Sequence, residues 1–181
     1  MKSEQEAYEK ELNKSLEAAR SVETVTMQHC LPEIWDGFSP PTPRDLTLSR
    51  IEDLGKRLTA LPEATRFDRK VQKLNTQRRG MLEKDRIDWG MAEMLAYATL
   101  VTDGTPVRIA GQDSVRGTFS HRHASSFIED TRERYTPMQH LSEKQAKFRI
   151  YNSPLNEFAA LGFDYGYALA RPEGLTIWEA Q

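Results

Sequence analysis

The chain has 181 residues, of which 38% are hydrophobic and 29% charged, and its formal net charge is −2. A weakly acidic chain lacks the basic excess of proteins that bind nucleic acid or anionic membranes, and no run approaches the roughly 20 apolar residues of a membrane span. Cys30 is the single cysteine and the N-terminus has neither a signal nor a transit peptide, so the expected compartment is the cytoplasm.

Residues 1–86 are predicted to form a helical connector. The stretch 3–20 has a helix-forming composition and almost no apolar face, which is typical of a peripheral helix. Residues 49–60 and 63–82 predict two further polar helices. Four of the nine prolines lie between 32 and 43, and prolines at that density block helix and sheet. This segment is therefore predicted to be an ordered excursion or a linker.

Residues 87–181 predict an α/β domain with a mostly parallel sheet. Asp88 suits the N-cap of a helix, and a turn at Asp103-Gly104 leads into a strand at 106–110. The stretch "VRIAG" reads as a short strand of the kind that is buried in a parallel sheet. The apolar face of the preceding helix is expected to consist of Met91, Met94, Leu95, Ala98 and Val101.

A polar loop is predicted from Gln112 to about Lys147. The strand "FRIYN", a helix that begins near Glu157 and the strand "LTIWEAQ" then follow. The order helix, strand, loop, strand, helix, strand is typical of an α/β fold.

Glu157 stands at the entrance to a helix that is expected to be largely buried, "EFAALGFDYGYALA". In one interpretation it is a first-turn carboxylate that the free amides and the helix dipole stabilise by about 0.3–1 kcal/mol. In the other, the flanking Leu155 and Phe158 desolvate the acid, which then shares a proton with a ligand nitrogen. Its position alone does not decide between the two.

The loop "GQDSVRGTFSHRHA", residues 111–124, follows the carboxyl end of a strand, where open α/β sheets place ligands. A pair of histidines with one residue between them can bind a metal, but the third ligand would be the distant His140 or Cys30, so no metal site is predicted. The serines lack the nucleophile-elbow setting of a hydrolase, and neither GxGxxG nor a Walker loop occurs. A solvated loop of charged residues is the alternative. The polar side chains it offers are Gln112, Asp113, Ser114, Arg116, His121 and His123.

Several segments, taken in order and at their spacing, resemble one family of enzymes, the thiamine-diphosphate-dependent decarboxylating first components of 2-oxoglutarate dehydrogenase complexes. These segments are "IDWGMAEMLAYATLV", "VRIAGQDSVRGTFSHRHA", "YTPMQHL", "YNSPLNEFAALGFDYGYALA" and "LTIWEAQ". The upstream "LTALPEATRFDRKVQKLNTQRRGML" is similar to the family's helical connector. The resemblance implies that residues 87–181 are the first part of a transketolase-like pyrimidine-binding domain.

The resemblance also implies roles for individual residues. Glu157 is expected to be catalytic, hydrogen-bonding the N1′ nitrogen of the thiamine diphosphate aminopyrimidine and sharing a proton with it. His123 is expected to be catalytic near the substrate, and is favoured over His121 because family members can carry glutamine at the latter position. Gln112 and Asp113 are expected beside the cofactor. His121, His123 and Arg116 are expected substrate contacts, with Arg116 also anchoring the loop.

The activity that the resemblance implies is oxidative decarboxylation of 2-oxoglutarate in the tricarboxylic acid cycle. The succinyl group would pass to a lipoyl-carrying partner, and the implied partners are a second copy of the enzyme, dihydrolipoyl succinyltransferase and dihydrolipoyl dehydrogenase. The family holds Mg²⁺ through a Gly-Asp-Gly motif in a separate domain, whereas glycine precedes neither Asp36-Gly37 nor Asp103-Gly104. The chain alone is therefore expected to be inactive. The alternatives are a non-catalytic relic or interaction module, or a related enzyme for 2-oxoadipate.

Overall fold

The computed structural model describes residues 2–21 and 46–180. The chain divides into two compact units, residues 1–40 and 41–181. In the first unit, α1 (Lys2–Arg20) is a helix where the sequence predicts one, and Tyr8, Leu12 and Leu16 are exposed on it. Cys30 and the proline-rich stretch 32–43 lie outside the described residues. No helix in the two described ranges has the length and apolar character needed to cross a membrane.

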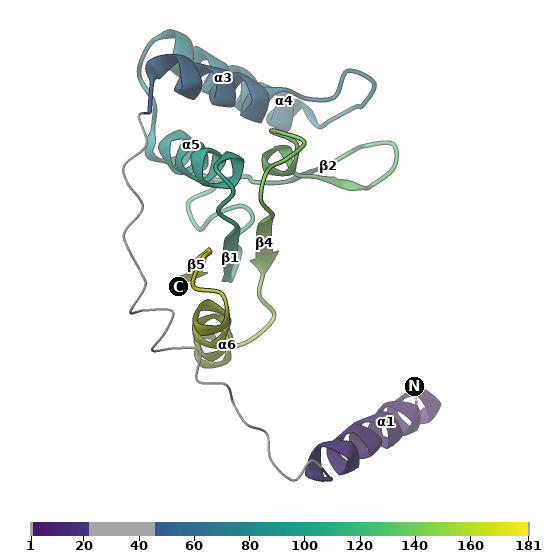
Figure 1. Ribbon diagram of the computed structural model, residues 1–181. Coiled ribbons are helices and arrows are strands. Elements are labelled where there is room, and N and C mark those ends of the chain that lie inside the picture. Colours follow the sequence, from purple (N-terminus) through teal and green to yellow (C-terminus); the bar gives the residue numbers. More distant parts are fainter. Residues whose placement is uncertain (1, 22–45, 181) are drawn as a thin grey trace. The chain divides into compact units, whose positions relative to one another are not determined.

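A sheet of three parallel strands forms the centre of the second unit. These strands are β1 (Val107–Gly111), β4 (Phe148–Asn152) and β5 (Leu175–Glu179), in the order β4-β1-β5. Both outer strands pair with β1 in parallel. The predicted α/β class with a parallel sheet is confirmed, and the bounds of each strand lie within two residues of those predicted (Figure 1).

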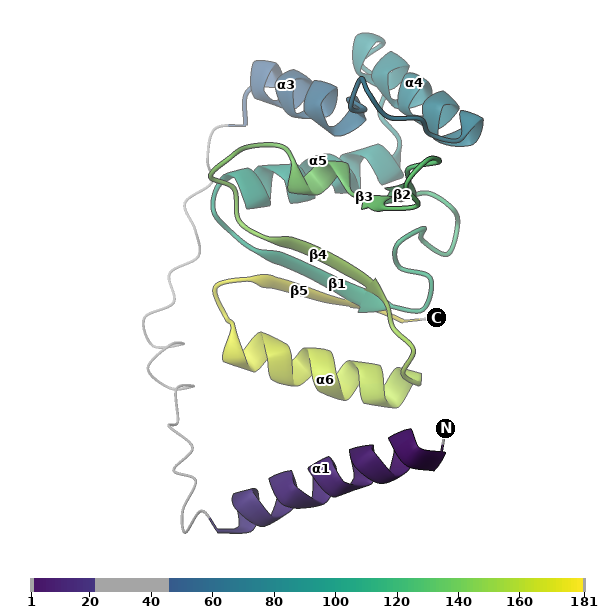
Figure 2. The ribbon, with the colours of Figure 1, turned by 90° about the vertical axis from the view of Figure 1, so that its right-hand side faces the viewer.

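The two faces of the sheet carry one helix each, α5 (Trp89–Thr102) and α6 (Glu157–Ala170), as Figure 2 shows. Asp88 caps α5 as predicted, accepting a hydrogen bond from the Met91 amide at 2.8 Å. The predicted apolar face of α5 is confirmed, because all five of its residues are buried in the core. The strand residues that share this core are Val107, Ile109, Phe148 and Ile150.

The expectation that α6 is largely buried is wrong for the described chain. Only Ala160 and Asp164 are buried in this helix, while Phe158 and Tyr165 are among its exposed large side chains. One side of α6 lies against the sheet, and no element within residues 46–180 covers its other side (Figure 2).

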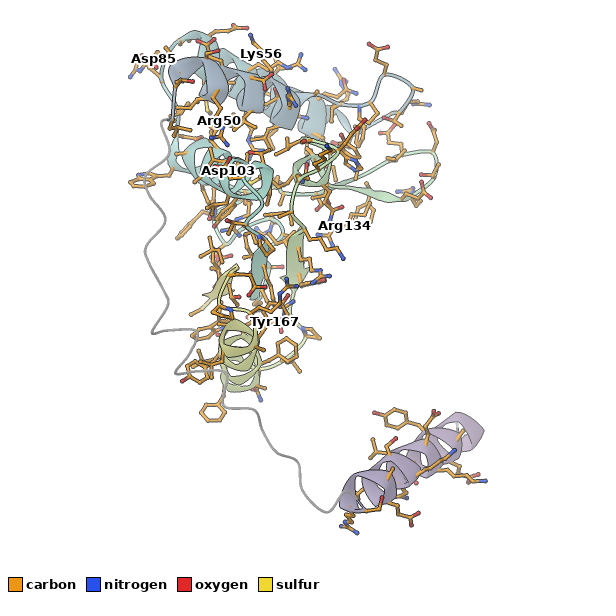
Figure 3. The ribbon with its side chains drawn as sticks, in the orientation of Figure 1. Arg50, Lys56, Asp85, Asp103, Arg134 and Tyr167 are labelled. Atoms are coloured by element: carbon orange, nitrogen blue, oxygen red, sulfur yellow. The ribbon has the colours of Figure 1, made fainter. Side chains whose placement is uncertain are left out.

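A helical layer of α3 (Leu48–Thr59) and α4 (Arg69–Glu83) lies beside α5. Leu54 and Leu58 of α3 join the core, and an ion pair of 2.6 Å connects Arg50 to Asp103 after α5 (Figure 3).

The helix predicted over residues 63–82 begins only at Arg69. Asp68 caps it by accepting a hydrogen bond from the Lys70 amide, so the helix starts after this residue. Phe67 is instead extended and forms a β-bridge with Ile128. A long-range strand contact has thus replaced the first turn of the predicted helix.

The predicted polar loop after β1 contains regular structure of its own. A short antiparallel hairpin joins β2 (Ser126–Phe127) to β3 (Arg134–Tyr135), and a single 3-10 turn, η1 (Pro137–Gln139), follows. The buried ring of Phe67 lies 5.7 Å from that of Tyr135. This contact attaches the hairpin to the segment that directly precedes α4.

Candidate functional site

The carboxyl ends of the three strands meet at one edge of the sheet, where Gly111, Asn152 and Glu179 end β1, β4 and β5. The backbone at Gly111 comes close to its neighbours. A Cβ at this position would lie 2.3 Å from the carbonyl oxygen of Glu179 and 2.8 Å from the Ser114 hydroxyl. Glycine therefore lets the loop after β1 fold tightly over the end of β5, at the edge where α/β proteins bind ligands.

Glu157 lies at this edge, in the first turn of α6. Asn156 caps the helix, accepting a hydrogen bond from the Ala159 amide at 2.9 Å. The Oε2 atom of Glu157 is buried and has no hydrogen-bond partner among the described residues. A buried carboxylate oxygen without a donor is uncommon, because desolvation costs free energy that a hydrogen bond normally offsets. This atom is available to a ligand donor.

The two neighbours named from the sequence are not themselves buried. Leu155 is 51% exposed and Phe158 is 89% exposed. Glu157 instead shares a side of α6 with Ala160 and Asp164, three and seven residues further on, which are the buried residues of the helix. Glu157 therefore lies on the side of α6 that carries the buried residues of the helix.

Two further buried polar atoms without a partner belong to β5, the Thr176 hydroxyl oxygen and the Trp178 indole nitrogen. These residues pair in register with Arg108 and Ala110 of β1. Arg108 contacts Asp164 of α6, so the register places both side chains on the face of the sheet that α6 covers. Trp178 lies one residue before the carboxyl end of its strand, at the same edge as Glu157.

The loop from Gly111 to Ala124 is held in place by polar contacts. Asn152 accepts a hydrogen bond from the Val115 amide at 2.9 Å. Arg116 bonds Asp113 and Ser120, each at 3.0 Å. Gln112 and Arg116 are exposed and Asp113 is half-buried.

Three non-glycine residues of this loop adopt left-handed backbone conformations. They are Asp113 with φ 55°, Ser120 with φ 54° and His123 with φ 43°. Such conformations are unfavourable, and they persist where surrounding contacts determine the backbone, often at functional sites. This loop therefore has a defined backbone conformation and is not an unstructured run of charged residues.

Arg122, which sequence reasoning missed, is the most buried charge of the loop. Its guanidinium donates to both oxygens of Glu93 on α5 at 2.8 Å and to Glu179 on β5 at 2.6 Å. It also bonds the carbonyl of Ser114. Burial alone would lower the pKa of Arg122, but the hydrogen bonds and charges of the two carboxylates raise it above its ordinary value. One side chain thus joins the loop to α5 and to the end of β5.

The sequence did contain a signal for this cluster. Glu93 is the single charged residue in the α5 segment "WGMAEMLAYATLVT". A lone carboxylate on a helix that is otherwise nearly apolar requires a partner when the helix is buried. Three arginines follow within the next 30 residues, and only the fold identifies Arg122 as that partner.

The two loop histidines have different surroundings. The His121 ring packs on Gly117, where an added Cβ would lie 2.4 Å from it, and its Nε2 is 3.9 Å from Glu93. His123 is exposed and lines a cavity of about 760 Å³ together with residues of α4 and the hairpin. Partial burial of the ring, followed by the charges of Arg78 and Arg116, lowers the pKa of His123.

The structure does not bring His123 and Glu157 together. His123 lines a small cavity together with Met91 and Met94 of α5, on one face of the sheet, whereas Glu157 begins the helix on the other face. No group of three metal-ligating side chains occurs in the part of the chain that the structure describes. His140 stacks on Tyr135, with 5.0 Å between the ring centroids.

Comparison with known proteins gives two consistent findings. The sequence profile of the family described as "Transketolase, pyrimidine binding domain" matches residues 85–181. Curated relatives carry the name "2-oxoglutarate dehydrogenase E1 component". The protein from Coxiella burnetii is 51% identical over 137 residues, and that from Staphylococcus aureus is 42% identical over 140 residues. These matches cover 75% and 76% of this chain and 15% of each relative.

A relative of the same name from Rickettsia conorii is 40% identical over 181 residues, which is 97% of this chain and 19% of the relative. The chain therefore spans less than a fifth of the length of the curated relatives it matches.

Proposed function

Because the chain belongs to the transketolase pyrimidine-binding domain family, we propose that it forms the pyrimidine side of a thiamine diphosphate site. One observation carries this proposal. The Glu157 Oε2 atom is buried without a partner in the first turn of α6, at the ligand-binding edge of a parallel sheet. A carboxyl group in such a place suits a heteroaromatic ring nitrogen, with which it shares one proton.

The chain's own residues hold and shield this acid. The Asn156 cap fixes the first turn of α6, and one oxygen of Glu157 is buried. When bound, thiamine diphosphate supplies the carbon nucleophile and the electron sink that decarboxylation of a 2-oxoacid requires. Glu157 would hold the proton at the ring nitrogen throughout. Gln112 and Asp113, in the turn that follows β1, would lie beside the cofactor.

We propose that the loop of residues 111–124, which Arg122 holds in place, contacts the substrate. Here His123 would stabilise charge that develops on the substrate, with His121 and Arg116 as further contacts. His123 and Glu157 lie on opposite faces of the sheet in this chain, so we propose that they contribute to a site through different surfaces. A homodimer provides a natural way to combine them, because a second copy can present the complementary surface.

The activity we propose is that of the first component of a 2-oxoglutarate dehydrogenase complex, as the relatives are named. Such an enzyme decarboxylates 2-oxoglutarate oxidatively and passes the succinyl group to a lipoyl-bearing partner. Its companions would be dihydrolipoyl succinyltransferase and dihydrolipoyl dehydrogenase, its compartment the cytoplasm, and its Mg²⁺ site would lie outside residues 1–181. Residues 1–86 would be the connector to the domain at 87–181. A 2-oxoadipate enzyme and a non-catalytic interaction module are the competing assignments.

The test is the substitution Glu157→Gln in an enzyme of the relatives' full length that contains this segment. Glutamine keeps the shape but cannot share a proton, so hydrogen–deuterium exchange at the thiazolium carbon of bound cofactor should slow by at least about 10²-fold. Glu173→Gln is the matched control, because Glu173 is an exposed carboxylate beyond the other end of α6. An unchanged exchange rate in Glu157→Gln would remove this residue from the mechanism.

A further inference from the structure

The side of α6 that meets the sheet is unusually polar. Glu157, Ala160, Asp164 and Tyr167 follow one another at intervals of three or four residues, so they share this side of the helix. Ala160 is the one buried apolar residue of α6. A helix normally keeps its rotation on a sheet by interlocking apolar side chains. α6 has few such side chains, so another interaction must fix its rotation on the sheet.

Arg108, the second residue of β1, supplies that interaction. Its Nε donates to Asp164 Oδ1 at 2.7 Å, and the two side chains are 15% and 3% exposed. The guanidinium carbon also lies over three aromatic rings, at 5.0 Å from Tyr151, 5.1 Å from Phe163 and 4.9 Å from Tyr167. Figure 3 shows Tyr167 between α6 and the strands.

This arrangement restricts α6 in several directions at once. An arginine binds a carboxylate in the plane of its guanidinium and attracts aromatic rings above and below that plane. Asp164, Phe163 and Tyr167 all belong to α6, whereas Arg108 and Tyr151 belong to the neighbouring strands β1 and β4. Rotation or sliding of α6 would break the ion pair and the ring contacts together.

We propose that Arg108 is a positioning residue for Glu157, the acid of the proposed function on which this inference rests. Asp164 and Glu157 are seven residues apart, about 10 Å along one rigid helix, on the same side. A rotation of α6 that released Asp164 would carry the Glu157 carboxylate away from its shielded place at the sheet edge. Arg108 thus fixes the position and orientation of the Glu157 carboxyl group without contacting it.

The matched control is Arg149, a second arginine on the same face of the sheet. It pairs in register with Arg108 across β1 and β4, and its Nη1 bonds the Tyr167 hydroxyl at 3.3 Å. It therefore contacts α6 as well, but through a single longer hydrogen bond and without the buried carboxylate. Arg149→Met removes a cation and some packing from the same face and leaves the Arg108–Asp164 pair intact.

The experiment compares four variants with the wild type in an enzyme of the relatives' full length. These are Arg108→Met, Arg108→Lys, the double variant Arg108→Met/Asp164→Leu, and Arg149→Met. The double variant replaces a buried ion pair by apolar groups, an exchange that often leaves stability unharmed. If carbon exchange is slow in this variant although its stability is unharmed, the loss is due to the rotation of α6 and not to its stability.

Three quantities are measured for each variant. The first is the thermal unfolding midpoint without cofactor. The second is the rate of hydrogen–deuterium exchange at the thiazolium carbon, at saturating thiamine diphosphate and Mg²⁺. The third is backbone amide exchange in the first turn of α6, residues 157–160, in the cofactor-free protein, which reports on the helix without any chemistry.

Arg108→Met is expected to slow carbon exchange by about 10-fold or more, since small misplacements of a reacting group cost this much. The double variant should regain the unfolding midpoint but keep the slow carbon exchange and show faster amide exchange at residues 157–160. Arg108→Lys should fall between them, and Arg149→Met should stay within about 2-fold of the wild type for both rates. If Arg108→Met does not fold, the lysine and double variants supply the same comparison.

Recovery of carbon exchange as well as stability in the double variant would overturn the proposal, because α6 would then hold Glu157 correctly without the arginine. Equal losses in Arg108→Met and Arg149→Met would also overturn it. Failure of the proposed function is recognised separately, as Glu157→Gln with wild-type carbon exchange. In that event amide exchange in the cofactor-free protein still decides whether Arg108 fixes the first turn of α6.

Discussion

The guanidinium of Arg122 binds the carboxylate of Glu93 through two parallel hydrogen bonds, Nε to Oε2 and Nη2 to Oε1, both 2.8 Å long. This paired geometry is the strongest that arginine and a carboxylate adopt. The same side chain reaches Glu179 at 2.6 Å, so three elements that are far apart in sequence meet at one buried charge. The cluster underlies the loop that carries both candidate histidines.

Arg122→Met should therefore destabilise the protein strongly. The methionine fills most of the space but leaves Glu93 and Glu179 without their cation, and breaking a buried pair in this way costs about 3–5 kcal/mol. Urea unfolding followed by circular dichroism measures the loss. Arg171→Met is the control, because Arg171 pairs with Glu173 on the surface and its removal should leave the midpoint unchanged. A loss no larger than that of the control would show that the cluster is dispensable.

Acid should weaken the same cluster. Burial alone would raise the pKa of Glu93, but the hydrogen bonds and charge of Arg122 outweigh burial and lower it. A carboxyl group with a lowered folded-state pKa stabilises the fold above its ordinary pKa of about 4.3, and this contribution disappears as the pH falls through the folded-state value. Comparison of urea midpoints at pH 7 and in acid should show a smaller acid loss in Glu93→Gln than in the wild type. Equal losses would contradict the assignment.

His123 should remain uncharged to a lower pH than an ordinary histidine. Burial lowers its pKa, and the charges of Arg78 and Arg116 lower it further. The neutral ring thus favours the fold above about pH 6.5, and this contribution is lost as the pH falls through the folded-state pKa. An NMR titration of the ring measures it. Arg116→Gln should raise the pKa of His123, whereas Arg149→Gln, on the other face of the sheet, should not.

Gly111→Ala should destabilise the strand edge. Its methyl group would meet the carbonyl oxygen of Glu179 at 2.3 Å, and a forced contact with backbone costs about 1–3 kcal/mol. Gly162→Ala is the opposite case, since a Cβ there meets nothing within 4 Å and alanine favours a helix by about 0.5–1 kcal/mol over glycine. Thermal unfolding should move in opposite directions for the two variants. An unchanged or raised unfolding midpoint in Gly111→Ala would show that glycine is not sterically required at this position.

The sequence predicted those parts of the fold that depend on neighbours along the chain. Asp88 caps α5 through a bond to a residue three positions away, and the spacing of Met91, Met94 and Leu95 follows the helical repeat. The position of Glu157 in the first turn of α6 was predicted for the same reason. The start of α4 was not, because Phe67 has a strand partner 61 residues further along.

The sequence by itself determined the α/β order and the three parallel strands, because local hydrogen bonds and apolar periodicity depend on residues that are close along the chain. It also carried the resemblance on which the functional proposal depends. Only the tertiary structure decided what surrounds Glu157, which arginine pairs with Glu93 and which with Asp164, and on which face of the sheet His123 lies. Each of these depends on contacts between segments brought together by packing. Arg108 and Asp164 are 56 residues apart, and Arg122 and Glu179 are 57 apart. The sequence shows which charged residues would need a partner if they were buried, but only the folded structure shows which residue that partner is.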